Sequence, residues 1–124
     1  MTLIEFPLKK IPNQPPEKYY GNKEYKIYLS FSNKKSIIEK KATQMLFRIY
    51  EGKGKAKYII GIKDDGEAIG INLEKVLESI RYLTQMTLRI NAKLNKIRIY
   101  KGNYGYITTV HVIKNDLKTL DLHL

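Results

Sequence analysis

Apolar and polar residues alternate with the two-residue period of a β-strand in several short stretches of the chain. In residues 23–31, for example, Tyr25, Ile27, Leu29 and Phe31 fall on one side, and polar residues, with Tyr28 among them, fall on the other. The same signal recurs after each run of turn residues. It predicts strands at residues 23–31, 55–63, 68–71, 93–101 and 106–114.

The segment from Lys55 to Ile71 is predicted to be a β-hairpin at the centre of the sheet. Its two apolar runs are joined by Asp64-Asp65-Gly66. Aspartate tolerates a positive φ and glycine adopts it freely, so this tripeptide favours a tight turn. A helical pattern lies on either side of the segment, which is why we expect the hairpin to be central.

Two other segments repeat their apolar residues every three or four positions, as amphipathic helices do. They are residues 34–50 and 73–91. Ser32-Asn33 precedes the first segment and Asn72 precedes the second. Side chains of this kind accept hydrogen bonds from the free N–H groups of a first helical turn, so they predict N-caps. Gly52 is expected to end the first helix.

These elements predict an α+β fold, a single domain with one mixed β-sheet and two helices packed on one of its faces. The order along the chain is β-α-β-β-α-β-β. Residues 1–22 hold all four prolines and are predicted to be an extended arm, because proline removes a donor and favours extended backbone in its neighbours. Residues 23–114 are predicted to form the domain, and residues 115–124 a tail.

The composition fits one globular domain that needs neither a membrane nor disulfides. The chain has 124 residues, of which 43% are hydrophobic, so it can bury a core. It contains no apolar run near the roughly 20 residues that span a bilayer, and its start lacks the apolar centre of a signal peptide. We therefore expect a cytoplasmic protein without a membrane partner. The absence of cysteine excludes disulfides and thiolate metal sites.

The chain is strongly basic. It carries 23 Lys and Arg against 12 Asp and Glu, a net charge of +11, and its pI is about 9.7. Such an excess favours polyanionic partners, with nucleic acid first. The alternative is a solvated, lysine-rich surface of the kind found in thermophile proteins, and the bias toward Lys, Ile and Tyr also fits a thermophile.

The sheet face that the helices leave open is predicted to bind RNA. Its strand residues include lysine, arginine and tyrosine; cations suit phosphates, and flat rings suit the unstacked bases of single-stranded RNA. A second basic region spans residues 34–57, where lysines surround the glycines of a loop at 51–54. The alternative for both regions is an ordinary solvated surface. The RNA-binding residues that these two regions predict are Lys26, Tyr28, Arg48, Lys53, Lys55, Lys57, Lys96, Arg98 and Tyr100.

Residues with catalytic potential are few. Glu24, Asp64 and Asp65 are the acids that could hold Mg²⁺, although the two aspartates also suit a turn. His111 and His123 stand alone in the sequence, and a histidine within a strand is usually structural. The chain has no nucleophile motif and no nucleotide-binding P-loop. We therefore expect no catalysis, no cofactor and no metal.

Four short motifs stand in a characteristic order along the chain. They read GNKEYK at 21–26, ATQM at 42–45, RIYEGKGKA at 48–56 and IGIKDDG at 60–66. As an ordered set they resemble the N-terminal region of the GTP-binding proteins related to elongation factor one-alpha, over about residues 15–114. The GTPase domain of that translation-associated family is expected to be absent, because no Walker loop or guanine-specificity motif fits in this chain. The resemblance implies a stand-alone module near ribosomes, tRNA or mRNA.

Two of these positions, Glu24-Tyr25-Lys26 and the segment 61–65, are also similar to Schlafen and AlbA-like domains, more distantly. Some Schlafen proteins cut tRNA or rRNA with two glutamates and an aspartate. By this resemblance Glu24 and one of the two aspartates supply two of the acids. Tyr19 stands where the other glutamate is expected, and Glu17 is out of register. An incomplete set of acids holds a divalent ion poorly, which favours binding over cutting.

The sequence therefore predicts a non-catalytic RNA-binding module of the translation apparatus, with ribosomal RNA or tRNA and the ribosome as partners. Two alternatives stay open. One is a Schlafen-like, metal-dependent RNA endonuclease, and the other is a protein–protein adaptor whose arm and tail dock a partner.

Overall fold

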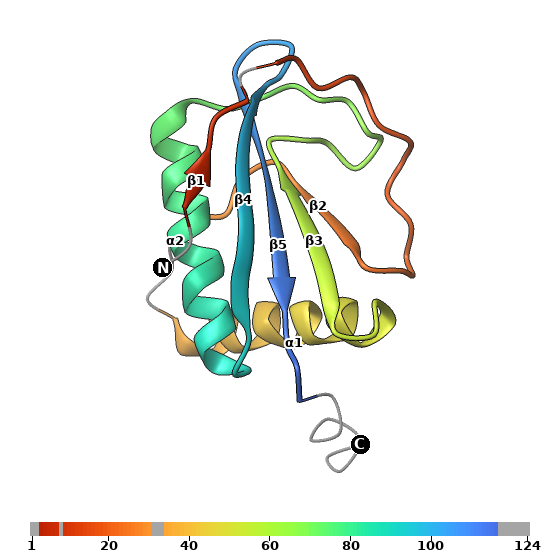
Figure 1. Cartoon of the computed structure of the whole chain (residues 1–124), viewed down its shortest axis with the longest axis vertical. Helices are drawn as coiled ribbons and strands as arrows, with labels where there is room; N and C mark the ends of the chain where they lie inside the picture. The colour runs from red at the N-terminus through yellow and green to blue at the C-terminus, as the bar shows by residue number, and fades with distance from the viewer. Residues whose placement is uncertain (1–2, 8, 31–33, 117–124) are drawn as a thin grey trace.

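Five strands pair into one mixed sheet in the computed structural model, which describes residues 3–7, 9–30 and 34–116. The strands are β1 (Ile4–Glu5), β2 (Lys23–Lys26), β3 (Lys55–Ile60), β4 (Lys93–Lys101) and β5 (Tyr106–Ile113), and the helices are α1 (Lys35–Glu51) and α2 (Leu73–Arg89). Both helices lie behind the sheet, with α2 along the strands and α1 across them (Figure 1). The predicted α+β class, with two helices on one face of a mixed sheet, is confirmed.

The strands follow the order β1-β4-β5-β3-β2 across the sheet. The pairs β1/β4 and β2/β3 are parallel, and β3/β5 and β4/β5 are antiparallel. Because parallel neighbours need a crossover, α1 carries the chain from the end of β2 back to the start of β3. The hairpin between β4 and β5 needs only a short turn.

The main core lies between the helices and the sheet. Alternate residues of the three central strands point to this side: Ala56, Tyr58, Ile60, Ile97, Ile99, Val110 and Val112. Met45 and Ile49 of α1 and Leu83 and Met86 of α2 pack against them, each at most 1% exposed. Burial of a side chain of this size contributes about 1.5–3 kcal/mol, so this layer is the main source of stability.

A smaller apolar cluster covers part of the opposite face. Its buried members are Tyr25, Ile59, Ile62, Ala68 and Ile107, and Ile11 and Tyr100 pack against them. The cover consists of the N-terminal arm and the loop that follows β3. Two backbone hydrogen bonds join these segments, from Gln14 N–H to the Gly66 carbonyl at 2.7 Å and from Glu17 N–H to the Asp64 carbonyl at 2.8 Å.

The predicted central hairpin is only partly correct. The turn at Asp64-Asp65-Gly66 is present, with the Gly66 N–H donating to the Lys63 carbonyl at 2.9 Å. The predicted return strand at 68–71 does not pair with β3; only Ile71 forms an isolated bridge, to Tyr106. The reason is that both edges of β3 are already occupied, by β2 and by β5.

The chain before α1 also differs from the prediction. The first predicted strand, 23–31, is paired only over Lys23–Lys26, and Phe31 lies outside the described residues. The arm contains a short strand, β1, that was not predicted, since its two residues pair only with β4, far along the chain. The predicted strands 55–63, 93–101 and 106–114 correspond to β3, β4 and β5, with β3 ending three residues early, at Ile60.

The helix ends follow the prediction closely. Helix α2 is capped by Asn72, whose Oδ1 accepts from the Lys75 N–H at 2.8 Å, and Glu74 stands in its first turn. Helix α1 ends at Gly52, as expected, but its N-cap position is occupied by Lys34, whose carbonyl accepts from the Ile37 and Ile38 N–H groups and whose side chain does not cap the helix. The predicted cap residues Ser32 and Asn33 lie outside the described residues, as do the tail leucines Leu117 to Leu124. Neither helix is long and apolar enough to cross a membrane.

The docking of the arm leads to a stability prediction at Gly66. This residue has a φ of +96°, and a Cβ added there would meet the Gln14 carbonyl oxygen. Gly66→Ala should therefore lower the free energy of unfolding by roughly 2–4 kcal/mol, from left-handed strain plus displacement of the arm. Urea unfolding measures the loss.

Gly21→Ala is the matched control. Gly21 has a similar φ of +91°, but nothing lies within 4 Å of an added Cβ. This variant should lose only the roughly 1–2 kcal/mol of backbone strain. Equal losses in the two variants would show that the contact between the arm and Gly66 adds nothing to stability.

Candidate nucleic-acid interface

A row of basic side chains crosses the open face of the sheet. Lys23 of β2 pairs in register with Lys57 of β3, Lys57 with His111 of β5, and His111 with Lys96 of β4. Neighbouring strands are about 4.8 Å apart, so these four residues span about 14 Å at right angles to the strands. We call them the basic row.

Each side chain of the basic row is placed by the alternation of its strand. Lys57 stands between the core residues Ala56 and Tyr58, and His111 stands between the core residues Val110 and Val112. On β4, a register irregularity between Leu94 and Lys96 changes which residues face the core. A β-bulge of this kind reverses the alternation, so it brings Lys96 onto the same face as His111.

The cations of the basic row are close enough to repel one another and to shift each other's pKa. Burial lowers the pKa of His111, and the positive charges of Lys57, Lys96, Arg98 and Lys55 lower it further. Burial also lowers the pKa of Lys57, as do the charges of Lys23 and Arg98. The face therefore holds mutually repelling positive charges, an arrangement that a bound anion would stabilise.

Arg98 and Tyr100 extend the basic row along β4, as predicted. Arg98 lies beside the next pair of the ladder, opposite Thr109, and its Nε donates to Glu5 Oε1 of β1 at 3.3 Å. Both side chains of this ion pair are more than a third exposed, so the pair contributes little to stability. Tyr100 is half-buried against the smaller apolar cluster, which leaves only part of its ring accessible.

Lys53 and Lys55 lie at the end of the sheet, where β3 begins. Both line an open cleft of about 740 Å³, together with Asn95 of β4 and residues around Ile113. Lys53 has a φ of +54° between two glycines. The structure thus brings Lys53, Lys55, Lys57, Lys96, Arg98 and Tyr100 to one face and one edge of the sheet.

Two predicted residues, Lys26 and Tyr28, do not lie on the open face. Lys26 pairs in register with Ile60, which faces the helices, and its Nζ lies 3.5 Å from Glu24 Oε2. Tyr28 follows the strand, and Lys75 of α2 stands over its ring at 5.1 Å. The predicted facing of β2 was wrong because the arm supplies a second apolar layer. Tyr25 packs under that layer, and its Oη donates to the Pro15 carbonyl at 2.9 Å.

Arg48 is buried and does not belong to the open face either. Its side chain is only 7% exposed. Nε donates to Glu24 Oε1 at 2.8 Å, Nη1 to the Gly21 carbonyl and Nη2 to the Lys18 carbonyl, both at 3.0 Å. All these partners are within the protein, so Arg48 joins α1 to β2 and to the arm.

Two acids of the alternative nuclease hypothesis, Glu24 and Asp65, are already engaged. Glu24 forms ion pairs with Arg48 and Lys26. Asp65 Oδ1 accepts from the Glu67 N–H at 2.9 Å, which is turn chemistry. Burial raises the pKa of Glu17, and the nearby charges of Glu24 and Asp64 raise it further. Within the described residues, no three His, Asp or Glu side chains are placed to hold a metal ion.

Two members of the basic row, Lys23 and His111, are not among the RNA-binding residues that the sequence predicts. Lys23 was overlooked because Tyr25, two residues later, was assigned to the helix side of β2. His111 stands alone in the sequence, which predicts a structural histidine. The sequence does contain a pattern that identifies it as an open-face residue. His111 stands between Val110 and Val112, so its side chain must point to the open face once those valines are assigned to the core.

The chain is similar to a segment of GTP-binding protein 2. It is 34% identical to that protein of mouse (Mus musculus) and of human (Homo sapiens) over 93 residues, which is 75% of this chain and 15% of those proteins. It is 33% identical over 82 residues to the uncharacterized protein R625 of Acanthamoeba polyphaga mimivirus, which covers 65% of this chain and 44% of that one. The similarity supports the expected relation to a GTP-binding protein at this coarse level, and the chain spans only 15% of the length of GTP-binding protein 2.

No protein-family model and no solved structure matches the chain. The interface is therefore assigned from its own residues.

The environment of Arg48 predicts a structural role that can be separated from binding. Arg48→Met should lower the free energy of unfolding by roughly 3–5 kcal/mol, because it leaves the mostly buried Glu24 without its main partner. Arg48→Lys keeps the positive charge but loses the planar guanidinium and its several N–H donors. It should therefore be more stable than Arg48→Met and less stable than the wild type. Urea unfolding distinguishes the three proteins. Normal stability together with lost RNA binding would make Arg48 a binding residue instead.

Proposed function

We propose that this chain is a non-catalytic RNA-binding module that binds through the basic row. One observation carries the proposal: four strands place Lys23, Lys57, His111 and Lys96 side by side on the open face. A row of this kind fits a chain of phosphates, because each phosphate neutralises charges that otherwise repel one another.

The charge of the whole chain supports the same proposal. A net charge of +11 attracts any polyanion at long range and raises the rate of encounter. The basic row, with Arg98, Lys53 and Lys55 beside it, is the surface at which a polyanion attracted in this way would bind. RNA is favoured over other polyanions because Tyr100 shares the open face and Tyr20 lines a pocket together with Lys23, and both offer rings on which bases stack.

We further infer that the RNA belongs to the translation apparatus, as ribosomal RNA or tRNA. This inference rests on the motifs that resemble the GTP-binding proteins related to elongation factor one-alpha. The likeness to GTP-binding protein 2 supports the relation at its coarser level. RNA cleavage is not part of the proposal, because Glu24, which the Schlafen resemblance would use, is ion-paired to Arg48 and Lys26.

The salt dependence of RNA binding tests the basic row directly. Lys57→Ala/Lys96→Ala removes two cations from its centre. On single-stranded RNA the slope of log affinity against log salt concentration should fall by about 1.4, at roughly 0.7 per lost phosphate contact. Fluorescence anisotropy over a series of salt concentrations measures it.

The matched control removes the same charge elsewhere. Lys35 and Lys40 are exposed on α1, which covers the other face of the sheet. Lys35→Ala/Lys40→Ala should therefore keep the wild-type slope. If the slope falls equally in both double variants, attraction by net charge alone explains the binding and the proposal fails.

His111 makes RNA affinity depend on pH. Its pKa is lowered in the free protein by burial and by the surrounding cations, so it is mostly neutral above about pH 6.5. Bound phosphates offset those cations and raise the pKa, so binding takes up a proton. By linkage, affinity should rise several-fold as the pH falls from about 7.5 to about 5.5.

His111→Gln should flatten that pH dependence, whereas His123→Gln, the other histidine of the chain, should leave it in place. Anisotropy titrations at fixed ionic strength measure both. If the RNA affinity of His111→Gln still rises as the pH falls, as that of the wild type does, the titrating group is a different residue.

A further inference from the structure

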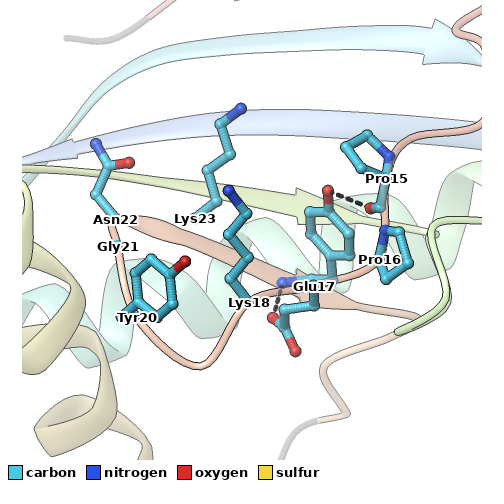
Figure 2. Close-up of a pocket in the computed structure, with 9 residues that line it drawn as sticks. Pro15, Pro16, Glu17, Lys18, Tyr20, Gly21, Asn22 and Lys23 are labelled. Carbon is cyan, nitrogen blue, oxygen red and sulfur yellow. Dashed lines mark hydrogen bonds between the residues drawn. The ribbon is translucent and has the colours of Figure 1, made fainter.

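A small pocket opens beside the basic row, between the arm and the start of β2. Its volume is about 270 Å³, and its lining includes Pro15, Pro16, Lys18, Tyr20 and Lys23. The two prolines lie toward one end and Tyr20 toward the other, with the two lysines between them (Figure 2). Lys23 belongs both to the pocket and to the basic row, so the two features are continuous.

The walls of the pocket are held in place before any ligand arrives. Arg48 donates to the carbonyls of Lys18 and Gly21, both at 3.0 Å, and so fixes the backbone on each side of Tyr20. At the other end, Tyr25 Oη holds the Pro15 carbonyl at 2.9 Å. A site fixed in this way loses little conformational entropy on binding.

The chemistry of the lining suits a flat ring that is attached to phosphate. Tyr20 is 65% exposed, so much of its ring is accessible to a stacking partner, and Lys18 Nζ stands over the ring at 5.8 Å from its centroid. Lys18 and Lys23 supply two cations. The Glu17 carboxylate also lines the pocket, but it is engaged by the Tyr25 N–H at 2.6 Å and lies 3.8 Å from Arg48.

We propose that this pocket holds one unstacked nucleobase of a single-stranded RNA whose phosphates continue onto the basic row. The inference rests on the proposed function and deepens it, because a paired duplex cannot offer a single base to so small a pocket. Tyr20 supplies the stacking surface, and Lys18 and Lys23 bind the adjoining phosphates.

The test compares Tyr20→Ala with Tyr19→Ala on two probes, a single-stranded RNA oligonucleotide and inorganic polyphosphate. Tyr19 is the matched control because it is 97% exposed, adjoins Tyr20 and does not line the pocket. Tyr20→Ala should weaken RNA binding on the order of tenfold, the usual effect of one lost stacking contact. It should leave polyphosphate binding unchanged, since polyphosphate has no base. Tyr20→Phe should bind RNA like the wild type.

Three results would overturn the inference. They are an RNA affinity of Tyr20→Ala equal to that of Tyr19→Ala, an equal loss on polyphosphate, and an equal loss on fully duplex RNA. Thermal unfolding of each variant confirms that the fold is kept. The failure of the proposed function looks different: there, Lys57→Ala/Lys96→Ala would bind RNA as well as its control on α1 does. If that variant loses binding and Tyr20→Ala does not, only the base pocket is wrong.

Discussion

The buried guanidinium of Arg48 is the interaction on which the rest of the structure depends. It reaches from α1 to the carboxylate of Glu24 on β2 and to the carbonyls of Lys18 and Gly21 in the arm. A planar guanidinium can donate hydrogen bonds to several acceptors in different directions, which an ammonium group does less well. Because these contacts hold the end of the arm against β2, the arm can cover Tyr25 and close one end of the open sheet face.

That partial cover explains why the exposed part of the face is so basic. The arm and the loop after β3 bury the apolar residues at one end, and the basic row lies on the part that they leave open. The packing of Val110 and Val112 and of Ala56 and Tyr58 forces His111 and Lys57 into neighbouring positions despite their repulsion. Sites where a fold tolerates an unfavourable local arrangement are often functional, and here a bound polyanion would relieve the repulsion.

Several of the site residues could be found from the sequence, since Lys55, Lys57, Lys96, Arg98 and Tyr100 follow the strand period and share one face. Lys26, Tyr28 and Arg48 could not be placed from the same pattern. Their positions depend on what covers each side of β2, and β2 is an edge strand with apolar layers on both sides. The same holds for Lys23, which was not predicted. It lies two residues before Tyr25 on β2, so its side chain points to the same face of the sheet as that of Tyr25.

The sequence by itself determined the two helices, the four longer strands, the Asp64-Asp65-Gly66 turn and the excess of positive charge. These features depend on residues that are close together in the chain, through periodicity, capping and turn chemistry. Only the tertiary structure decided that β3 lies between β2 and β5, that β1 joins β4, and that Lys23, Lys57, His111 and Lys96 form one row. These outcomes depend on which segments compete for each strand edge and each sheet face, and that competition is between residues far apart in the sequence.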